Sequence, residues 1–221
     1  MRPVSRHRSL QDIATVADPL RASIYELVSR SRESVGRDEV ARELGLARHA
    51  AAFQLDRLAE QGLLTVEFRR LNGATGPGSG RPSKVYRATR TEVSASVPQR
   101  EYTVAADIMA EAIDASRLDG RSMDEHLPEA AREAGRRLAA GQADVQAFLA
   151  TNGYRPEDRQ DGTTDLTNCP FHSLANRHTD TVCGINQELI CGALETLGSE
   201  RHTERVEPSA PCGCCVRLAA E

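Results

Sequence analysis

The first third of the chain carries hydrophobic residues at helical spacing. Apolar side chains recur every three or four positions in three consecutive segments, which predicts helices at residues 18–30, 37–44 and 47–61. Asp18 followed by Pro19 is typical of a helix start. We therefore expect this part of the chain to begin with a compact group of helices.

Two strand-like segments follow these helices. Val66 and Phe68 alternate with polar residues over 65–71, as expected of a half-buried strand, and residues 83–89 form a second such segment. Residues 72–82, between them, are rich in glycine. The pattern predicts a two-stranded hairpin, or wing, after the third helix.

The next part of the chain is predicted to be helical. Residues 91–100 are polar and are expected to link two domains, and a broad apolar stripe predicts a helix over 101–116. Helical spacing continues to residue 150, where Gly135 and Gly141 are expected to interrupt it.

The last part of the chain mixes short strand-like segments with one amphipathic helix at 183–198. The sequence therefore predicts an α+β protein in three parts. They are a domain of helices and a wing at 12–90, a central helical segment at 101–150 that is expected to contribute to a dimer, and a small α+β, Cys-rich domain at 151–221.

Charge is unevenly distributed along the chain. Residues 1–90 hold 16 Lys and Arg against 10 Asp and Glu, a net +6, whereas residues 91–221 hold 12 against 22, a net −10. A basic domain of this size suggests a polyanionic partner, most often nucleic acid. The first residues, MRPVSRHRSLQD, lack the apolar stretch of a signal peptide, and no apolar run approaches the roughly 20 residues of a membrane helix. We expect a cytoplasmic protein without a membrane partner.

Cysteine is confined to the end of the chain, because all six cysteines lie in the last 53 residues. In a cytoplasmic protein, clustered cysteines more often ligate metal or sense redox state than form structural disulfides. The six are Cys169, Cys183, Cys191, Cys212, Cys214 and Cys215.

The segments VGRDEVARELGLARHAAAFQLDRLAEQGLL and GRPSKVYRAT resemble the winged helix-turn-helix of bacterial ArsR-like and MarR-like regulators. The resemblance covers about residues 15–90 and implies that the third predicted helix enters the major groove of DNA. There, Arg48 can donate two hydrogen bonds to guanine, His49 can donate one to a base or phosphate, and Arg57 can reach a phosphate. The implied partner is a double-stranded operator bound by a homodimer.

The expected DNA-binding residues lie on this helix and on the hairpin. Alanines near the helix start let the backbone approach the DNA, and cationic residues around the hairpin loop are expected to contact the backbone and the minor groove. The full set is Arg48, His49, Ala52, Gln54, Arg57, Arg69, Arg70, Arg81 and Lys84.

Three further segments, NCPFH, VCGINQELICGAL and CCVRL, extend the resemblance over nearly the whole chain. Together with the winged helix they resemble the actinobacterial and cyanobacterial ArsR-like regulators that include the iron–sulfur repressor of the SUF operon. The resemblance implies repression, and a C-terminal sensor domain in which three cysteines hold a 4Fe–4S or 2Fe–2S cluster. Those roles fall here on Cys169, Cys183 and one of Cys212, Cys214 and Cys215.

Spacing leaves the third cysteine open, since 28, 30 or 31 residues separate Cys183 from Cys212, Cys214 or Cys215. Because Cys183 is predicted to open the 183–198 helix, the helix dipole is expected to favour its thiolate.

Two further residues, His172 and Cys191, are expected to play different parts. His172, three residues after Cys169, is a candidate fourth ligand, and the Cys-x-x-His spacing also suits zinc. Cys191 lies eight residues after Cys183 on the same predicted helix, too far to share one ion with it, and is expected to be a small core residue.

The sequence thus predicts a transcriptional repressor whose operator affinity is controlled by an iron–sulfur cluster. One alternative keeps the DNA-binding domain and replaces the cluster with a zinc site or a thiol–disulfide switch. Another is a metal or redox partner protein that does not bind DNA. No G-x-S-x-G, P-loop or H-E-x-x-H motif is present, so neither enzymatic activity nor a small-molecule substrate is expected.

Overall fold

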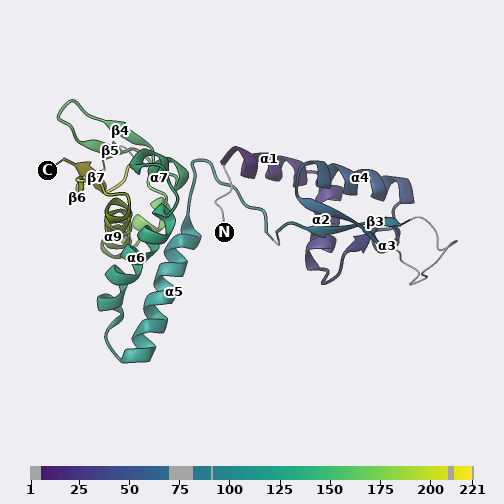
Figure 1. Ribbon diagram of the computed structural model, residues 1–221, viewed down its shortest axis with the longest axis horizontal. Coiled ribbons are helices and arrows are strands. Elements are labelled where there is room, and N and C mark those ends of the chain that lie inside the picture. Colours follow the sequence, from purple (N-terminus) through teal and green to yellow (C-terminus); the bar gives the residue numbers. More distant parts are fainter. Residues whose placement is uncertain (1–5, 70–81, 91, 209–211, 221) are drawn as a thin grey trace. The chain divides into compact units, whose positions relative to one another are not determined.

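The structure is a computed structural model that describes residues 6–69, 82–90, 92–208 and 212–220, with side chains described from residue 10 onward. The chain divides into two compact units, residues 1–95 and 96–221. Each unit combines helices with a small antiparallel sheet (Figure 1), so the chain is a mixture of α and β structure, as expected. No helix in the described ranges is long and apolar enough to cross a bilayer.

The helices of the first unit follow the hydrophobic pattern closely. The three predicted helices end within one residue of their expected bounds, and the Asp18 carboxylate caps the second helix by accepting a hydrogen bond from the Arg21 amide at 3.0 Å. An additional helix at the start of the chain was not predicted. The helices described are α1 (Arg6–Val16), α2 (Pro19–Arg30), α3 (Arg37–Glu43) and α4 (Arg48–Glu60).

The hairpin of the first unit belongs to a three-stranded sheet. The predicted strands appear as β2 (Leu64–Arg69) and β3 (Ser83–Ala88), and β1 (Val35–Gly36) pairs with the other edge of β3. β1 was not predicted, because a strand of two residues is too short to show an alternating pattern. Residues 70–81, which include most of the predicted loop, lie outside the described residues.

One apolar core holds this unit together. The inward positions of α2, α3 and α4 pack with β1, β2 and β3, and their side chains are almost fully inaccessible to water. A buried ion pair adds to this core, because Arg90 donates to the Asp12 carboxylate of α1 at 2.5 Å. The principal core side chains are Ile24, Val28, Val35, Val40, Ala51, Leu55, Leu58 and Leu63.

The second unit is built on three longer helices. A capping box fixes the start of α6, because the side chains of Ser122 and Glu125 each bond the other residue's backbone amide. Gly120, with φ at +76°, ends the preceding helix in a left-handed conformation. The helices are α5 (Tyr102–Asp119), α6 (Met123–Ala139), α7 (Val145–Thr151), α8 (His172–Ala175) and α9 (Thr179–Thr196).

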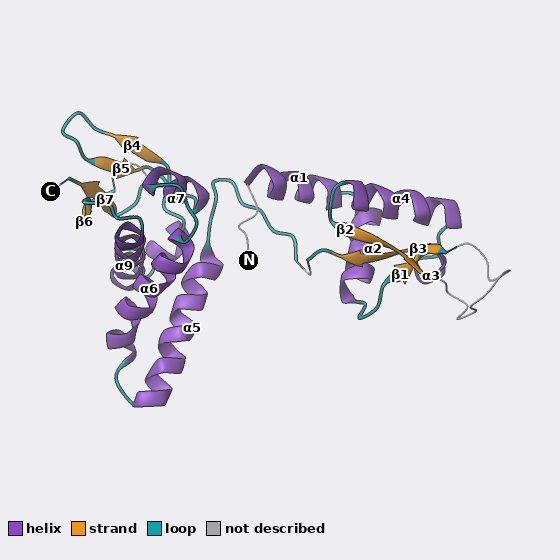
Figure 2. Cartoon of the chain, viewed as in Figure 1, coloured by secondary structure: helices purple, strands orange, loops and turns teal. Residues whose placement is uncertain are grey.

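A four-stranded antiparallel sheet completes this unit (Figure 2). Its strand order is β4-β5-β7-β6, so the last strand of the chain lies in the middle of the sheet. The strands are β4 (Pro156–Asp158), β5 (Thr164–Leu166), β6 (His202–Arg205) and β7 (Val216–Ala219). The residues at 101–150 and those at 151–221 contribute to one continuous apolar core.

Helices α6 and α9 approach each other closely at two glycines. A Cβ on Gly135 would overlap the carbonyl oxygen of Leu189, and a Cβ on Gly192 would overlap that of Arg132. The prediction that Gly135 interrupts a helix was therefore wrong. Gly135 lies inside α6, where its missing side chain lets the α9 backbone come near, whereas Gly141 does follow the end of the helix with φ at +81°.

Candidate cysteine site and nucleic-acid interface

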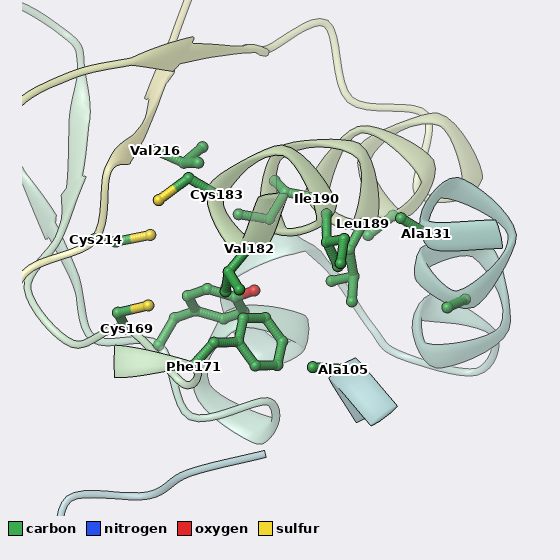
Figure 3. Close-up of a cluster of buried hydrophobic side chains, with 14 of the residues drawn as sticks. Ala105, Ala131, Cys169, Phe171, Val182, Cys183, Leu189, Ile190, Cys214 and Val216 are labelled. Carbon is green, nitrogen blue, oxygen red and sulfur yellow. The ribbon is translucent and has the colours of Figure 1, made fainter. Parts of the chain in front are cut away.

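Four cysteines come together beside α9. Cys169 lies in the loop before α8, Cys183 lies on α9, and Cys214 and Cys215 immediately precede β7. Their exposed fractions are between 3% and 8%. Figure 3 shows Cys169, Cys214 and Cys183 in a row beside the part of α9 that begins with Val182. Residues separated by up to 46 positions in the sequence thus form one sulfur-rich group.

Two of these cysteines are bonded to each other. The Sγ atoms of Cys183 and Cys215 are paired as a disulfide, and their Cα atoms are 6.4 Å apart, within the usual range for such a bond. Of the three cysteines that spacing left open as the third ligand, the structure brings Cys215 to Cys183.

The other two cysteines interact through their side chains. A hydrogen bond from the Cys214 thiol lowers the pKa of Cys169, against the opposing effect of burial, and the Arg100 guanidinium contributes in the same direction. The same hydrogen bond and burial raise the pKa of Cys214 well above its usual value. Cys169 is therefore the member of this pair that more readily carries negative charge.

Two buried polar side chains hold Cys214 in place. The Asn186 side chain, fully buried on α9, donates from Nδ2 to the Cys214 Sγ at 2.9 Å. Its Oδ1 accepts a hydrogen bond from the Tyr154 hydroxyl at 2.5 Å. Burial raises the pKa of Tyr154 well above its usual value, so this hydroxyl remains a donor at physiological pH.

A pocket of about 330 Å³ opens next to the cysteine group. Cys169, His172, Cys183 and Cys215 line it, together with Arg205 and its neighbours after β6. The half-buried His172 begins α8, and its Nε2 lies 3.2 Å from the Asn176 amide nitrogen. Three predicted thiol ligands and the predicted imidazole thus share one pocket.

Cys212 and Cys191 have different surroundings. The half-buried Cys212 contributes its backbone carbonyl, which accepts a hydrogen bond from the Cys169 amide at 2.9 Å. Cys191 is only partly buried, and its Sγ lies 3.1 Å from the Thr203 hydroxyl of β6. The expectation that Cys191 is a core residue is therefore met only in part, because one side of it faces the edge of the sheet.

The expected position of Cys183 at a helix start was wrong. α9 begins at Thr179, so Cys183 is its fifth residue and the helix dipole acts mainly on the turn before it. The apolar pattern could not place this boundary, because the added first turn is mostly polar and lacks a side-chain cap. A dipole-stabilised Cys183 thiolate is not supported.

The cysteines and the histidine that line the pocket could ligate an iron–sulfur cluster or zinc only after the Cys183–Cys215 disulfide is reduced. Within the part of the chain that the structure describes, no three His, Cys, Asp or Glu side chains form a metal-binding group. Cys183 and Cys215 are bonded to each other, and thiolates rather than disulfide sulfurs ligate iron or zinc. Reduction of that bond would supply three thiols and an imidazole around one pocket.

The predicted DNA-binding residues at the start of α4 are accessible. Arg48 and His49 are exposed in its first turn, and Ala52 is partly exposed. Arg48 Nη2 donates to the Asp38 carboxylate of α3 at 2.7 Å. An exposed ion pair of this kind contributes at most about 1 kcal/mol, so a DNA phosphate or base can compete for the guanidinium.

The remaining predicted residues of α4 differ in accessibility. The exposed Arg57 has no acidic partner among the described residues and lines an open pocket with Arg21. Gln54 is partly buried, and its Oε1 is inaccessible to water and has no hydrogen-bond donor in the described structure. Gln54 therefore does not present this oxygen at the surface.

On the hairpin, two predicted cations also have acidic partners. Arg69 pairs with Glu67 at 3.0 Å, and Lys84 pairs with Asp56 of α4 at 2.9 Å. Asp56 also accepts a hydrogen bond from the Tyr86 hydroxyl at 2.8 Å, so it fixes α4 against the hairpin. The remaining predicted residues, Arg70 and Arg81, lie outside the described residues.

Sequence reasoning missed three kinds of feature at these sites. It did not identify the acidic partners Asp38 and Asp56, nor the exposed rings of Phe53 and Phe68, nor Asn186 beside the cysteines. Asn186 carried a usable signal, because it lies three residues after Cys183 and so on the same face of the helix.

No family model, curated protein or solved structure matches the chain.

Proposed function

We propose that the chain is a transcriptional repressor that binds operator DNA through a winged helix-turn-helix in its first unit. In this proposal its second unit controls operator affinity through an iron–sulfur cluster. The observation that carries the DNA-binding part is the arrangement around α4. This helix follows α3 after a short turn, precedes a hairpin, and carries exposed Arg48 and His49 in its first turn. Such a helix start is the part that enters the major groove in helix-turn-helix proteins.

The rest of the first unit provides the expected backbone contacts. The exposed side chain of Arg57 is free of acidic partners among the described residues, and Arg69 and Lys84 extend the cationic surface onto the hairpin. A homodimer would present two α4 helices to a near-palindromic operator. The exposed apolar residues of α5, such as Ile113 and Leu118, are available for that contact.

Cys169, Cys183, Cys215 and His172 are the residues that would hold the cluster, because they line one pocket. When bound, the cluster would supply sensitivity to oxygen, oxidants or iron supply. The chain's own contribution is the burial of the thiols and the hydrogen bond that Asn186 donates to Cys214 in the same sulfur group. Gain or loss of ligation at this group would shift the protein between two arrangements with different operator affinity.

DNA binding is tested with the reduced full-length protein and a randomised 20-bp double-stranded DNA library. We expect enrichment of a near-palindromic sequence, and an affinity that falls steeply with salt. Arg48→Ala should weaken binding about tenfold, as expected for the loss of a bidentate base contact. Arg30→Ala removes an exposed arginine at the end of α2 and should leave the affinity unchanged. Absence of any enriched sequence would contradict the proposal.

Cluster binding is tested by anaerobic purification followed by iron, sulfide and zinc analysis. We expect iron and sulfide in comparable amounts in the wild type, and loss of both in Cys169→Ser, Cys183→Ser and Cys215→Ser. Cys191→Ser, which changes a thiol of the same helix outside the pocket, should retain both. Zinc at one ion per chain would favour a zinc-bearing regulator instead.

A thiol–disulfide switch is the second candidate, because the structure pairs Cys183 with Cys215. In that mechanism the two thiols form one S–S bond and pass two electrons and two protons to an oxidant such as a peroxide. A cellular dithiol returns two electrons and two protons and restores both thiols. A change in operator affinity on oxidation of metal-free protein would favour this switch, whereas a response seen only with bound iron would favour the cluster.

A further inference from the structure

Helix α4 exposes an aromatic ring that none of the predicted contacts uses. The side chain of Phe53 is 61% exposed, although α4 packs Ala51, Leu55 and Leu58 fully into the core. Phe53 lies four residues after His49 and four before Arg57, so the three side chains share the solvent-facing side of the helix. An aromatic ring is thus placed in the middle of the surface proposed to face DNA.

The surroundings of this ring favour DNA over an apolar partner. His49 and Arg57 flank Phe53 along the helix, and Arg48 lies at the helix start. The nearby carboxylate, Asp56, is paired with Lys84, so the groups around the ring can still attract a polyanion. In the major groove, the apolar group available to such a ring is the 5-methyl of thymine, and phenylalanine is among the side chains that contact it. The same methyl is absent from the other three bases.

We propose that Phe53 is a specificity-determining residue that contacts the 5-methyl group of a thymine in the operator. The inference rests on the proposed DNA-binding function and extends it to a base preference. Phe53 lies five residues after Arg48, about 7.5 Å along the helix axis. That length corresponds to about two base-pair steps. The thymine should therefore lie about two base pairs from the guanine bound by Arg48, once in each half-site.

Phe68 provides a matched comparison because it is an exposed ring outside α4. Its side chain is 66% exposed on β2, directly opposite Lys84, which pairs with Asp56. Side chains directly opposite each other in an antiparallel pair lie on the same face of the sheet, so Phe68 lies beside Lys84 on the hairpin. In the proposed binding mode the hairpin would contact the sugar–phosphate backbone, so Phe68 is not expected to contact a base edge in the major groove.

The test uses the sequence that the full-length protein enriches from the randomised 20-bp library. Each thymine of that sequence is replaced in turn by uracil, which lacks only the 5-methyl group, and affinity is measured by fluorescence anisotropy. We expect one uracil substitution per half-site to weaken wild-type binding about fourfold, the loss corresponding to one apolar methyl group. Phe53→Ala should bind the thymine and uracil forms equally, and Phe53→Leu should retain part of the difference.

Phe68→Ala should retain the wild-type preference for thymine over uracil, whatever its effect on overall affinity. Equal sensitivity to uracil in the wild type and in Phe53→Ala would overturn the inference while leaving DNA binding established. The inference would also be overturned if Phe53→Ala changed the oligomeric state of the DNA-free protein but left the preference for thymine unchanged. That result would assign the ring to a protein–protein contact. If no sequence is enriched at all, the proposed function itself fails.

Discussion

The Asn186 side chain donates a hydrogen bond to the Cys214 sulfur at 2.9 Å, inside the cysteine group of the second unit. This contact connects α9 to the segment just before β7, and the Tyr154 hydroxyl completes it by donating to Asn186 Oδ1 at 2.5 Å. Both residues are almost fully buried. The pair therefore positions one of the four sulfurs and satisfies its own polar atoms in the core.

Replacement of Asn186 by alanine should destabilise the protein by about 1–3 kcal/mol, because the Tyr154 hydroxyl loses its acceptor in the core. Urea unfolding monitored by circular dichroism measures this change. The double variant with Tyr154→Phe should cost less than the sum of the two single changes. Gln187→Ala removes only a half-buried, 3.3 Å hydrogen bond to Thr203 and should cost less. Equal losses of unfolding free energy in Asn186→Ala and Gln187→Ala would contradict a stabilising role for the buried hydrogen bonds of Asn186.

The close contact of α6 and α9 gives a prediction about glycines. Gly192→Ala should destabilise the second unit by about 1–3 kcal/mol or more, because the new methyl group would overlap the Arg132 carbonyl oxygen. Gly184→Ala is the control on the same helix, since a Cβ there meets nothing within 4 Å. It should stabilise the helix by about 0.5–1 kcal/mol. Similar unfolding midpoints for the two variants would show that the helices are not packed as described.

The sheet of the second unit predicts a defined response to acid. Burial would raise the pKa of Asp165, but hydrogen bonds from Arg217 at 2.7 Å and Arg159 at 2.6 Å hold it below its usual value. A depressed carboxyl pKa stabilises the folded state above the unfolded pKa of about 3.9, and this contribution is lost as the pH falls through the folded value. The wild type should therefore lose stability more steeply below about pH 4 than Asp165→Asn does.

Thermal unfolding between pH 7 and pH 3 measures the difference between these two proteins. Asp107→Asn, a change at an exposed position on α5, should follow the wild-type curve. Parallel curves for the wild type and Asp165→Asn would show that the two arginines do not stabilise the ionised carboxylate.

The cysteine pairing makes a prediction about oxidised, metal-free protein. Alkylation followed by peptide mass spectrometry should find one disulfide, between Cys183 and Cys215, and free thiols at the other four positions. The pairing should be unchanged in Cys191→Ser. A bond that joins Cys169 to Cys183, or a mixture of pairings, would be inconsistent with the structure.

Local hydrophobic spacing predicted much of the fold, because α2, α3 and α4 each bury one regular face. It placed the strands of the hairpin correctly, but the expectation that Val66 and Phe68 form a half-buried face was wrong, since their side chains are 38% and 66% exposed. It missed α1, because that segment has few apolar residues. It also missed β1, because those two residues form a strand only by pairing with β3. It also misplaced the start of α9 and the role of Gly135, since both depend on tertiary neighbours.

Sequence patterns identified the cysteine group but could not choose among its members. Three cysteines lie within four positions near the end of the chain, and counting residues cannot decide which of them meets Cys183. The fold decides by directing Cys215 to Cys183 and Cys214 to Asn186. The exposed Phe53 was likewise invisible, because the hydrophobic pattern alone does not say which apolar residue of a helix remains outside the core.

Control of DNA affinity by the cysteine group can be tested by one comparison. The affinity of the full-length protein for its enriched 20-bp sequence is measured in a reduced anaerobic preparation and again after oxidation. The proposal predicts a change of at least tenfold in the wild type and in Cys191→Ser, and none in Cys183→Ser. Tight, sequence-specific binding that is identical in both states of the wild type would contradict it.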